Sequence, residues 1–283
     1  MNRNLKQYIG ITATRVITII SILFLITFLV FIFSKGWKVL SFSFLFESPR
    51  DGMTKGGIFP AIIGTLYLTL LSIAFAFPIG VLSAVYLSEY AKPKWLINII
   101  RMAINTLAGV PSIVFGLFGL AVFVGIFKFG VSVLSGALTL GVLILPIIIN
   151  ASEEAIKTVP KDFREAAYSL GATKRQTIMK VVLPTAMPSI LTGAIISVGR
   201  AAGETAPILF TAATFYTRKL PQSLSDEVMA LPYHIYALMT EGTHPDAQIP
   251  IAYGTAIVLL LLVLSINTVA IVVRYRIRRQ RKW

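Results

Sequence analysis

Long uncharged apolar runs constrain this chain more than any other feature. A helix that crosses the hydrocarbon core of a bilayer needs roughly 20 apolar residues, and six stretches of the sequence are long enough. They lie near 16–34, 60–88, 99–124, 132–151, 189–212 and 251–273. The composition agrees, because 13% of the residues are charged, against about 25% in soluble proteins. The sequence therefore predicts an all-α polytopic membrane protein with six transmembrane helices.

The first apolar run has 19 residues from 16 to 34. It is longer than the apolar region of a signal peptide, which spans about 7–15 residues, and no small-residue cleavage site follows it. We therefore expect it to remain in the protein as an anchor helix.

The distribution of Lys and Arg sets the orientation, because short cytoplasmic loops carry the excess of these residues. With both termini in the cytoplasm, 18 of the 26 basic residues lie on the cytoplasmic side, seven lie outside, and Arg200 lies in the membrane. The net charge of +14 then reflects segments that face anionic lipid, so it requires no nucleic-acid partner. We expect a multi-pass protein of the cytoplasmic membrane with both termini inside the cell.

Few residues point to catalysis or to a metal site. The chain has no cysteine, no G-x-x-x-x-G-K-[ST] loop and no Ser, His and carboxylate set. His234 and His244 both fall in the external segment before the last apolar run. Two solvated loop histidines are favoured there, because no third ligand stands at a recognisable spacing. In the same segment Ser225 is suited to begin a helix, with Asp226 and Glu227 in its first turn.

The longest polar interval on the cytoplasmic side, 152–188, predicts two short helices. The first has Pro160 near its start and Gly171 just past its end. Its apolar residues recur at i, i+3, i+4 and i+7, namely Phe163, Ala166, Ala167 and Leu170. The second opens with a capping box formed by Thr173 and Gln176 and runs to Pro184. The apolar stripe of the first helix requires a cover, either a partner protein or the lipid surface.

The stretch EAAYSLGATKRQTIMKVVLP resembles the EAA loop of ABC-transporter permeases. The pattern of that loop is E-A-A, three residues, Gly, nine residues, an aliphatic residue, any residue and Leu-Pro. Every element is matched, by Glu165, Ala166, Ala167, Gly171, Val181, Leu183 and Pro184. The resemblance implies that this loop is a coupling helix that sits in a cleft of a separate ATPase subunit.

The same resemblance implies a domain organisation. A type I ABC importer transmembrane domain would occupy 60–273, with the coupling loop at 152–188. Residues 1–59 would form the anchor helix and an external loop, and 274–283 a basic cytoplasmic tail.

Two further stretches, LAGVPSIVFGLFGL at 107–120 and GRAAGETAPILFTA at 199–212, resemble permeases of the phosphate-specific transport system. This implies a transport subunit, not an enzyme, that imports inorganic phosphate. The implied partners are a second, related permease, two ATPase subunits and an extracytoplasmic phosphate-binding protein. ATP and Mg would be used by the ATPase subunits, so this chain would bind no cofactor. The alternatives are an importer of another oxyanion, such as sulfate or phosphonate, and a gradient-driven secondary transporter, which would not need the EAA spacing.

Arg200 and Glu204 stand four residues apart in a run that is otherwise small or apolar. Ionised side chains at membrane depth almost always face a bundle interior or a water-filled path, and the planar fork of arginine suits phosphate oxygens. One side of a continuous helix would carry Gly193, Ser197, Arg200, Glu204 and Thr211. The candidates for the translocation path are Arg200, Glu204, Ser197, Thr205 and Thr211. The alternative is a structural ion pair within one helical turn.

The third apolar run is interrupted by five residues that are weaker candidates for the substrate path: Asn105, Thr106, Gly109, Pro111 and Ser112. A broken helix can direct free amides at an anion. Packing and kinking remain the favoured interpretation of these residues, because Gly and Pro are common in membrane helices.

Overall fold

The computed structural model describes residues 3–279, and they are largely helical. The long helices are α1 (Arg3–Gly36), α3 (Phe59–Val85), α6 (Val133–Lys157), α9 (Leu183–Gly203) and α12 (Pro245–Arg279). The shorter ones are α2 (Phe42–Phe46), α4 (Lys94–Ala108), α5 (Ser112–Gly119), α7 (Lys161–Ser169), α8 (Lys174–Thr177), α10 (Ala206–Thr211) and α11 (Leu231–Thr240).

Several shorter elements connect or extend these helices. A 3₁₀ turn, η1 (Trp37–Val39), follows α1. Three π-helical turns extend other helices: η2 (Tyr86–Tyr90), η3 (Leu120–Ile126) and η4 (Ile178–Val182). The strands β1 (Pro49–Arg50) and β2 (Lys55–Gly56) pair antiparallel, with Pro49 opposite Gly56.

Five helical segments are long and apolar enough to cross a membrane: Gly10–Val39, Phe59–Tyr90, Val133–Lys157, Lys174–Gly203 and Pro245–Ile277. Counted as one broken span, the pair Lys94–Ala108 and Ser112–Ile126, which is bent by 101°, makes a sixth candidate. The predicted all-α polytopic class is confirmed. The prediction of a single third span over 99–124 is wrong in shape, because the chain turns sharply at Gly109–Pro111.

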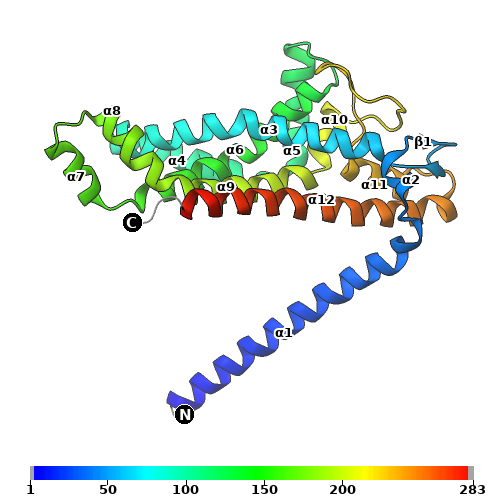
Figure 1. The fold of residues 1–283 in the computed structure, drawn as a ribbon, viewed down its shortest axis with the longest axis horizontal. Helices are drawn as coiled ribbons and strands as arrows, with labels where there is room; N and C mark the ends of the chain where they lie inside the picture. Colours follow the sequence, from blue (N-terminus) through cyan, green and yellow to red (C-terminus); the bar gives the residue numbers. More distant parts are fainter. Residues whose placement is uncertain (1–2, 280–283) are drawn as a thin grey trace.

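The core of the bundle is built by α3, α6 and α9, which lie against one another (Figure 1). Small residues allow this close approach. A Cβ atom on Gly193 of α9 would lie 2.3 Å from the Cβ of Ala151 in α6, and one on Gly80 of α3 would lie 2.6 Å from Ile148. Neither glycine can therefore be enlarged without moving a helix.

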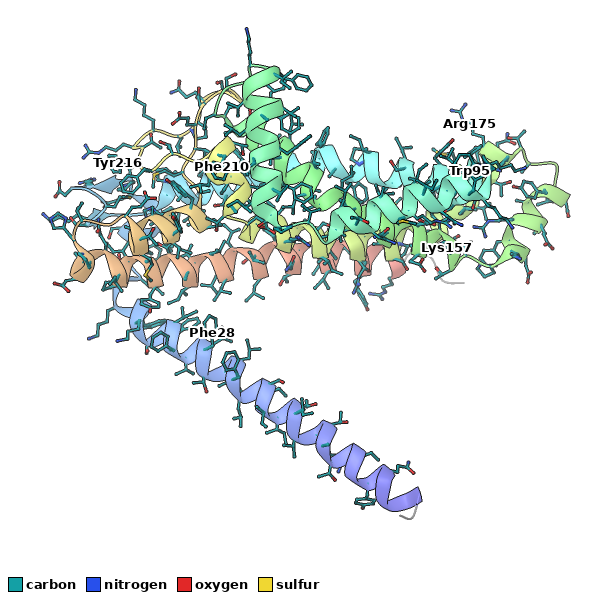
Figure 2. All side chains as sticks on the ribbon, turned by 180° about the vertical axis from the view of Figure 1, so that it is seen from behind. Phe28, Trp95, Lys157, Arg175, Phe210 and Tyr216 are labelled. Carbon is teal, nitrogen blue, oxygen red and sulfur yellow. The ribbon has the colours of Figure 1, made fainter. Side chains whose placement is uncertain are left out.

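The helix α1 diverges from the bundle and meets it only near its C-terminal end (Figure 1). There Phe31 packs edge-on against Tyr253 of α12, with ring centroids 5.7 Å apart. A Cβ on Gly36 would lie 2.6 Å from the Tyr253 backbone, so the two helices cross at a glycine. Along the rest of α1 the apolar side chains are exposed, Phe24 by 74%, and Figure 2 shows Phe28 and its neighbours standing clear of the bundle.

The fifth span differs from its predicted bounds of 189–212. The second cytoplasmic helix does not end at Pro184 but continues through η4 into α9, as one segment from Lys174 to Gly203. The π-helical turn directly before Pro184 widens the helix where proline cannot donate a backbone hydrogen bond. The helix ends instead at Gly203, because Pro207 would clash with the Gly203 carbonyl in a continuous helix.

Different helices and strands lie at the two ends of the molecule. Figure 1 shows the start of α1 and the end of α12 on the side of the molecule that carries α7 and α8, whereas β1, α2 and α11 lie at the opposite end. Trp95, Lys157 and Arg175 gather at the α7–α8 end in Figure 2. This arrangement agrees with the orientation inferred from the basic residues. Residues 274–279 are the last turns of α12, and 280–283 lie outside the described residues.

Candidate translocation site and coupling segment

Arg200 and Glu204 meet at the C-terminal end of α9. The Arg200 Nε lies 3.3 Å from the Glu204 Oε1, and the two side chains are 36% and 18% exposed. Glu204 is the C-cap of α9, with φ −76° and ψ 131°. A positive side chain in the last turn also interacts favourably with the helix dipole. The pair is therefore formed, and it is not enclosed by this subunit.

The depth of this pair follows from the contacts between α9 and α12. Arg274, near the cytoplasmic end of α12, donates a hydrogen bond to Thr192 Oγ1 at 2.8 Å. Arg200 stands eight residues further along α9, about 12 Å toward the outside at 1.5 Å per residue. That the pair lies at membrane depth stays a prediction.

Two other residues that were predicted to share the face of Arg200 are buried in this subunit: Ser197, three residues before it on α9, and Thr211, which lies on α10. Ser197 is fully buried, and its hydroxyl donates to the Gly193 carbonyl at 2.9 Å. Thr211 is also fully buried, and its hydroxyl donates to the Pro207 carbonyl at 2.8 Å. The expected face assumed one helix, but α9 ends at Gly203 and α10 begins anew at Ala206. Thr205 is the half-buried N-cap of α10, so it stays beside Glu204.

The two interrupted spans meet one another. A Cβ on Gly116 of α5 would lie 2.8 Å from the Ala206 carbonyl oxygen, and one on Gly119 would lie 2.9 Å from Thr211 Cγ2. These contacts place α5 directly on α10, with both helices running in the same direction. Val110, in the first break, and Ala201, beside the Arg200 pair, belong to one apolar cluster. The sequence signals at the two breaks therefore belong to neighbouring parts of the fold.

The five weaker candidates lie at the bend between α4 and α5. Asn105, Thr106, Gly109 and Pro111 are exposed, and Ser112 is half-buried. The Asn105 Oδ1 accepts a hydrogen bond from Asn150 Nδ2 at 2.9 Å. The structure therefore shows that this bend exists and that its polar side chains are accessible, and their contact with substrate stays a prediction.

Two polar side-chain contacts between α4 and α6, which together form a polar ladder, were not predicted from the sequence. It joins Asn105 to Asn150 and, one turn nearer the cytoplasm, Arg101 to Glu153. The Glu153 side chain is only 5% exposed and also lies 3.0 Å from Lys157 Nζ. The available signal was spacing, because the polar residues recur at i, i+4 on α4 and at i, i+3, i+7 on α6.

Asn267 of α12 was also missed. A Cβ on Gly199, the neighbour of Arg200, would lie 3.5 Å from its Nδ2. Its Oδ1 is buried and has no hydrogen-bond partner among the described residues. An amide in an otherwise apolar run was the only signal for this residue.

The cytoplasmic segment folds much as its pattern indicates. Pro160 is the N-cap of α7, and Gly171 follows the helix with φ +78°. Thr173 and Gln176 form both hydrogen bonds of the predicted capping box. Glycine is favoured at Gly171 because a side chain resists this left-handed conformation.

An apolar groove of about 960 Å³ lies between α7 and the helix that follows it. Five residues of the EAA pattern line it: Ala166, Ala167, Gly171, Val181 and Pro184. Glu165 is exposed, and Leu183 packs inward against the core cluster that contains Val182. Figure 1 shows α7 and α8 as the outermost elements of their end of the bundle. Docking of this groove to an ATPase stays a prediction.

The external segment corrects two expectations. His234 is 2% exposed and packs within α11, and burial lowers its pKa to about 4, so it is not a solvated loop histidine. Ser225 does not begin a helix; α11 starts at Leu231. Asp226 instead caps a turn, because its carboxylate accepts hydrogen bonds from the Gln222 and Ser223 amides, which lower its pKa. No group of three potential metal ligands occurs within residues 3–279.

Comparison with known proteins decides the family. Residues 76–282 match the family described as "Binding-protein-dependent transport system inner membrane component". The chain belongs to this family. The match confirms a multi-pass membrane subunit of a transport system, not an enzyme, and a system that works with a binding protein.

Individual members of the family are similar to this chain over most of their own length. A probable ABC transporter permease, YqgI of Bacillus subtilis, is 35% identical over 85% of this chain and 85% of its own. The phosphate transport system permease protein PstA 1 of Mycobacterium tuberculosis is 31% identical over 100% of this chain and 92% of its own. A bacterial alginate ABC transporter, solved with a periplasmic protein that carries an alginate pentasaccharide, superposes with a TM-score of 0.68 at 19% identity, over 95% of this chain and 94% of that one. The type I ABC importer fold expected for this family is confirmed.

Proposed function

We propose that the chain is one of two permease subunits of an ATP-driven importer of inorganic phosphate. The observation that carries the proposal is the similarity to a phosphate transport permease along the whole chain. The proposal is supported by chemistry as well, because an arginine, whose side chain suits an oxyanion, lies beside a break in its span.

The geometry of Arg200 leaves its phosphate-binding atoms available. Among the described residues its recorded partner is Glu204, through Nε. Two terminal guanidinium nitrogens thus remain for the oxygens of a mono- or dianion. Glu204 opposes tight anion binding, which suits a site that must release its substrate as well as bind it. Thr205 and Asn267 supply further polar groups nearby.

The proposed complex contains a second, related permease, two ATPase subunits and an extracytoplasmic phosphate-binding protein. The half-exposed side of α9 that carries Arg200 would face the second permease, and the path would run between the two subunits. The groove beside α7 would receive the ATPase, which binds ATP and Mg, so this chain binds neither. Closure of the ATPase subunits would then rock the helices between outward- and inward-facing states.

The proposal is tested with the complete complex in proteoliposomes. We expect ATP-dependent uptake of radiolabelled phosphate that requires the binding protein and survives an ionophore. Stronger competition by sulfate or a phosphonate would identify another oxyanion as the substrate. Loss of uptake with ionophore, and uptake without ATP, would identify a gradient-driven transporter.

The role of the Arg200–Glu204 pair is tested with Arg200→Gln, Glu204→Gln and the double variant at matched expression. If Arg200 meets the anion, the double variant assembles and fails to import, because an uncharged face no longer attracts phosphate. Glu204→Gln alone then holds phosphate more tightly and turns over slowly. Near-normal uptake by the double variant, with both singles impaired, would show that the two charges only neutralise each other. Unchanged uptake by Arg200→Lys would exclude bidentate recognition.

A further inference from the structure

Arg164, the residue before the EAA pattern, makes more hydrogen bonds than any charged side chain in its surroundings. Its Nε and Nη2 donate to Glu89 Oε1 at 3.2 and 2.8 Å. Its Nη2 also donates to the Ile156 carbonyl at 3.1 Å, and its Nη1 to the Val159 carbonyl at 2.8 Å. The side chains of Arg164 and Glu89 are 18% and 12% exposed. One guanidinium on α7 therefore ties together the ends of two membrane helices.

The two helix ends belong to different parts of the bundle. Ile156 lies in the last turn of α6 and Val159 lies two residues beyond its end, where carbonyl groups are no longer served by a continuing helix. The Ile156 carbonyl also accepts from the Val159 amide at 3.3 Å. Glu89 lies in η2, the π-helical extension of α3. Arginine serves both at once because its planar fork offers five donors in fixed directions, which lysine does not.

A second cation reaches the same place from the other cytoplasmic helix. Lys174, the first residue of α8, donates from Nζ to the Glu89 carbonyl oxygen. The same ammonium lies 4.8 Å from the centre of the Tyr90 ring, within the range of a cation–π contact. Each helix of the coupling segment, defined here as α7, the Gly171 turn and α8, is thus attached to η2 by one basic side chain.

Because η2 lies between α3 and α4, these contacts could transmit movement to both helices. Four residues after Tyr90 the chain begins α4 at Lys94, the helix that carries Arg101, Asn105 and the bend before α5. About 22 Å of helix separate Lys94 from Gly109 at 1.5 Å per residue. A displacement of η2 therefore acts both on α3 and on the helix that leads to the first break.

We propose that Glu89 is the joint through which movement of the coupling segment reaches α3 and α4, with Arg164 and Lys174 as its two attachments. Glu89 is a positioning residue in this scheme and contacts no substrate. The proposal rests on the proposed ATP-driven transport, because it assigns the route by which that movement enters the bundle. It differs from a capping role for Arg164, since that role concerns only the α6 carbonyls and does not need the Glu89 carboxylate.

The decisive variant is Glu89→Gln, which removes the charge from the joint and leaves the bonds from Arg164 to α6 in place. Lys174→Gln is the second variant, because it spares the carboxylate pair. Glu154→Gln is the matched control, since Glu154 is a glutamate at the same end of the molecule, is 73% exposed and, within residues 3–279, pairs with Lys157 alone. All three are compared in the complete reconstituted complex for ATPase co-purification, ATP hydrolysis stimulated by the binding protein, and phosphate imported per ATP.

We expect Glu89→Gln to assemble and to hydrolyse ATP, while phosphate imported per ATP falls at least about fivefold, the lower range of coupling between sites. Lys174→Gln should show a smaller fall and Glu154→Gln none. An unchanged ratio in Glu89→Gln overturns the proposal. Loss of the ATPase subunits from both Glu89→Gln and Lys174→Gln, in step with transport, overturns it as well, because the residues would then serve only assembly.

A distance measurement tests the joint without reference to the substrate. The chain has no native cysteine, so spin labels can be placed through Ser169→Cys on α7 and Lys94→Cys at the start of α4, both exposed positions. We expect a narrow distance distribution that is the same with and without trapped ATP, and a broad one when Glu89→Gln and Lys174→Gln are added. The proposal is overturned if the distance distribution of the parent shifts with ATP, or if the distribution does not change when the two substitutions are added. If the parent and Glu154→Gln import no phosphate, the proposed substrate is wrong, and this distance result still decides the joint.

Discussion

Glu153 and Glu154 form a matched pair for testing how burial changes the contribution of an ion pair to the stability of the protein. The Oε1 atoms of both lie 3.0 Å from the same Lys157 Nζ. Glu153 is 5% exposed and also meets Arg101 of α4, whereas Glu154 is 73% exposed. The two positions differ in burial and in the second partner, and hardly in geometry.

The expected magnitudes differ accordingly. Glu153→Gln leaves Arg101 and Lys157 without their shared carboxylate, and breaking a buried pair typically costs about 3–5 kcal/mol. Glu154→Gln removes an exposed pair worth less than about 0.5 kcal/mol. At about 2.1 cal/mol/K of unfolding entropy per residue, a 283-residue chain converts these losses into about 5–8 °C and less than about 1 °C of Tm.

The assay is thermal denaturation of the purified complex, followed by the fraction that remains monodisperse after heating. Asn105→Ala serves as a further variant, because it removes the neighbouring rung of the ladder without leaving a charge unpaired, and a smaller shift than that of Glu153→Gln is expected. Equal shifts for Glu153→Gln and Glu154→Gln would refute the reasoning.

Two further predictions follow from the Gly171 turn and from His234. Gly171→Val should assemble but lose phosphate-stimulated ATPase activity and uptake, because the φ of +78° at this position costs a β-branched residue about 1–3 kcal/mol, although open space surrounds the position. Gly171→Asn is the control and should be tolerated. Normal activity of the valine variant would mean that the turn is not needed for coupling. Burial lowers the pKa of His234 from 6.5 to about 4, so its contribution to stability is complete above pH 6.5 and is lost as the pH falls toward 4, by roughly 3 kcal/mol in all. The Tm of His234→Leu should therefore fall less than that of the parent over this interval, with exposed His244→Gln as the control, and parallel curves would contradict the buried neutral imidazole.

Features that depend on neighbouring residues in the chain were predictable. The capping box at Thr173, the left-handed Gly171 and the α7 stripe follow from local backbone geometry and hydrogen bonding. The apolar runs located the spans because a bilayer imposes a minimum length on any helix that crosses it. The family pattern at Glu165–Pro184 added the coupling role, which stays an expectation for the individual residues.

Features that depend on contacts between distant segments were not predictable in the same way. The pairing of Arg101 with Glu153 and of Arg164 with Glu89 requires knowing which helices are neighbours. The single helix expected over 189–212 failed because hydrophobicity alone does not show a break, although Gly203 and Pro207 provided a local signal for it. His234 was misplaced for a related reason, since a loop assignment says nothing of what packs over it.

The two broken spans are better understood together than separately. Gly116 allows α5 to lie directly on the backbone of α10, and Gly119 allows close approach to the side chains of Thr139 in α6 and Thr211 in α10. That contact can form only if α5 turns away from the line of α4, since the ladder of Asn105 and Arg101 holds α4 along α6. The 101° bend at Gly109–Pro111 satisfies both requirements. The interruption at Glu204–Thr205 lets α10 pack on α5 while α9 packs on α3 and α12, and α6 contacts both halves of each broken span.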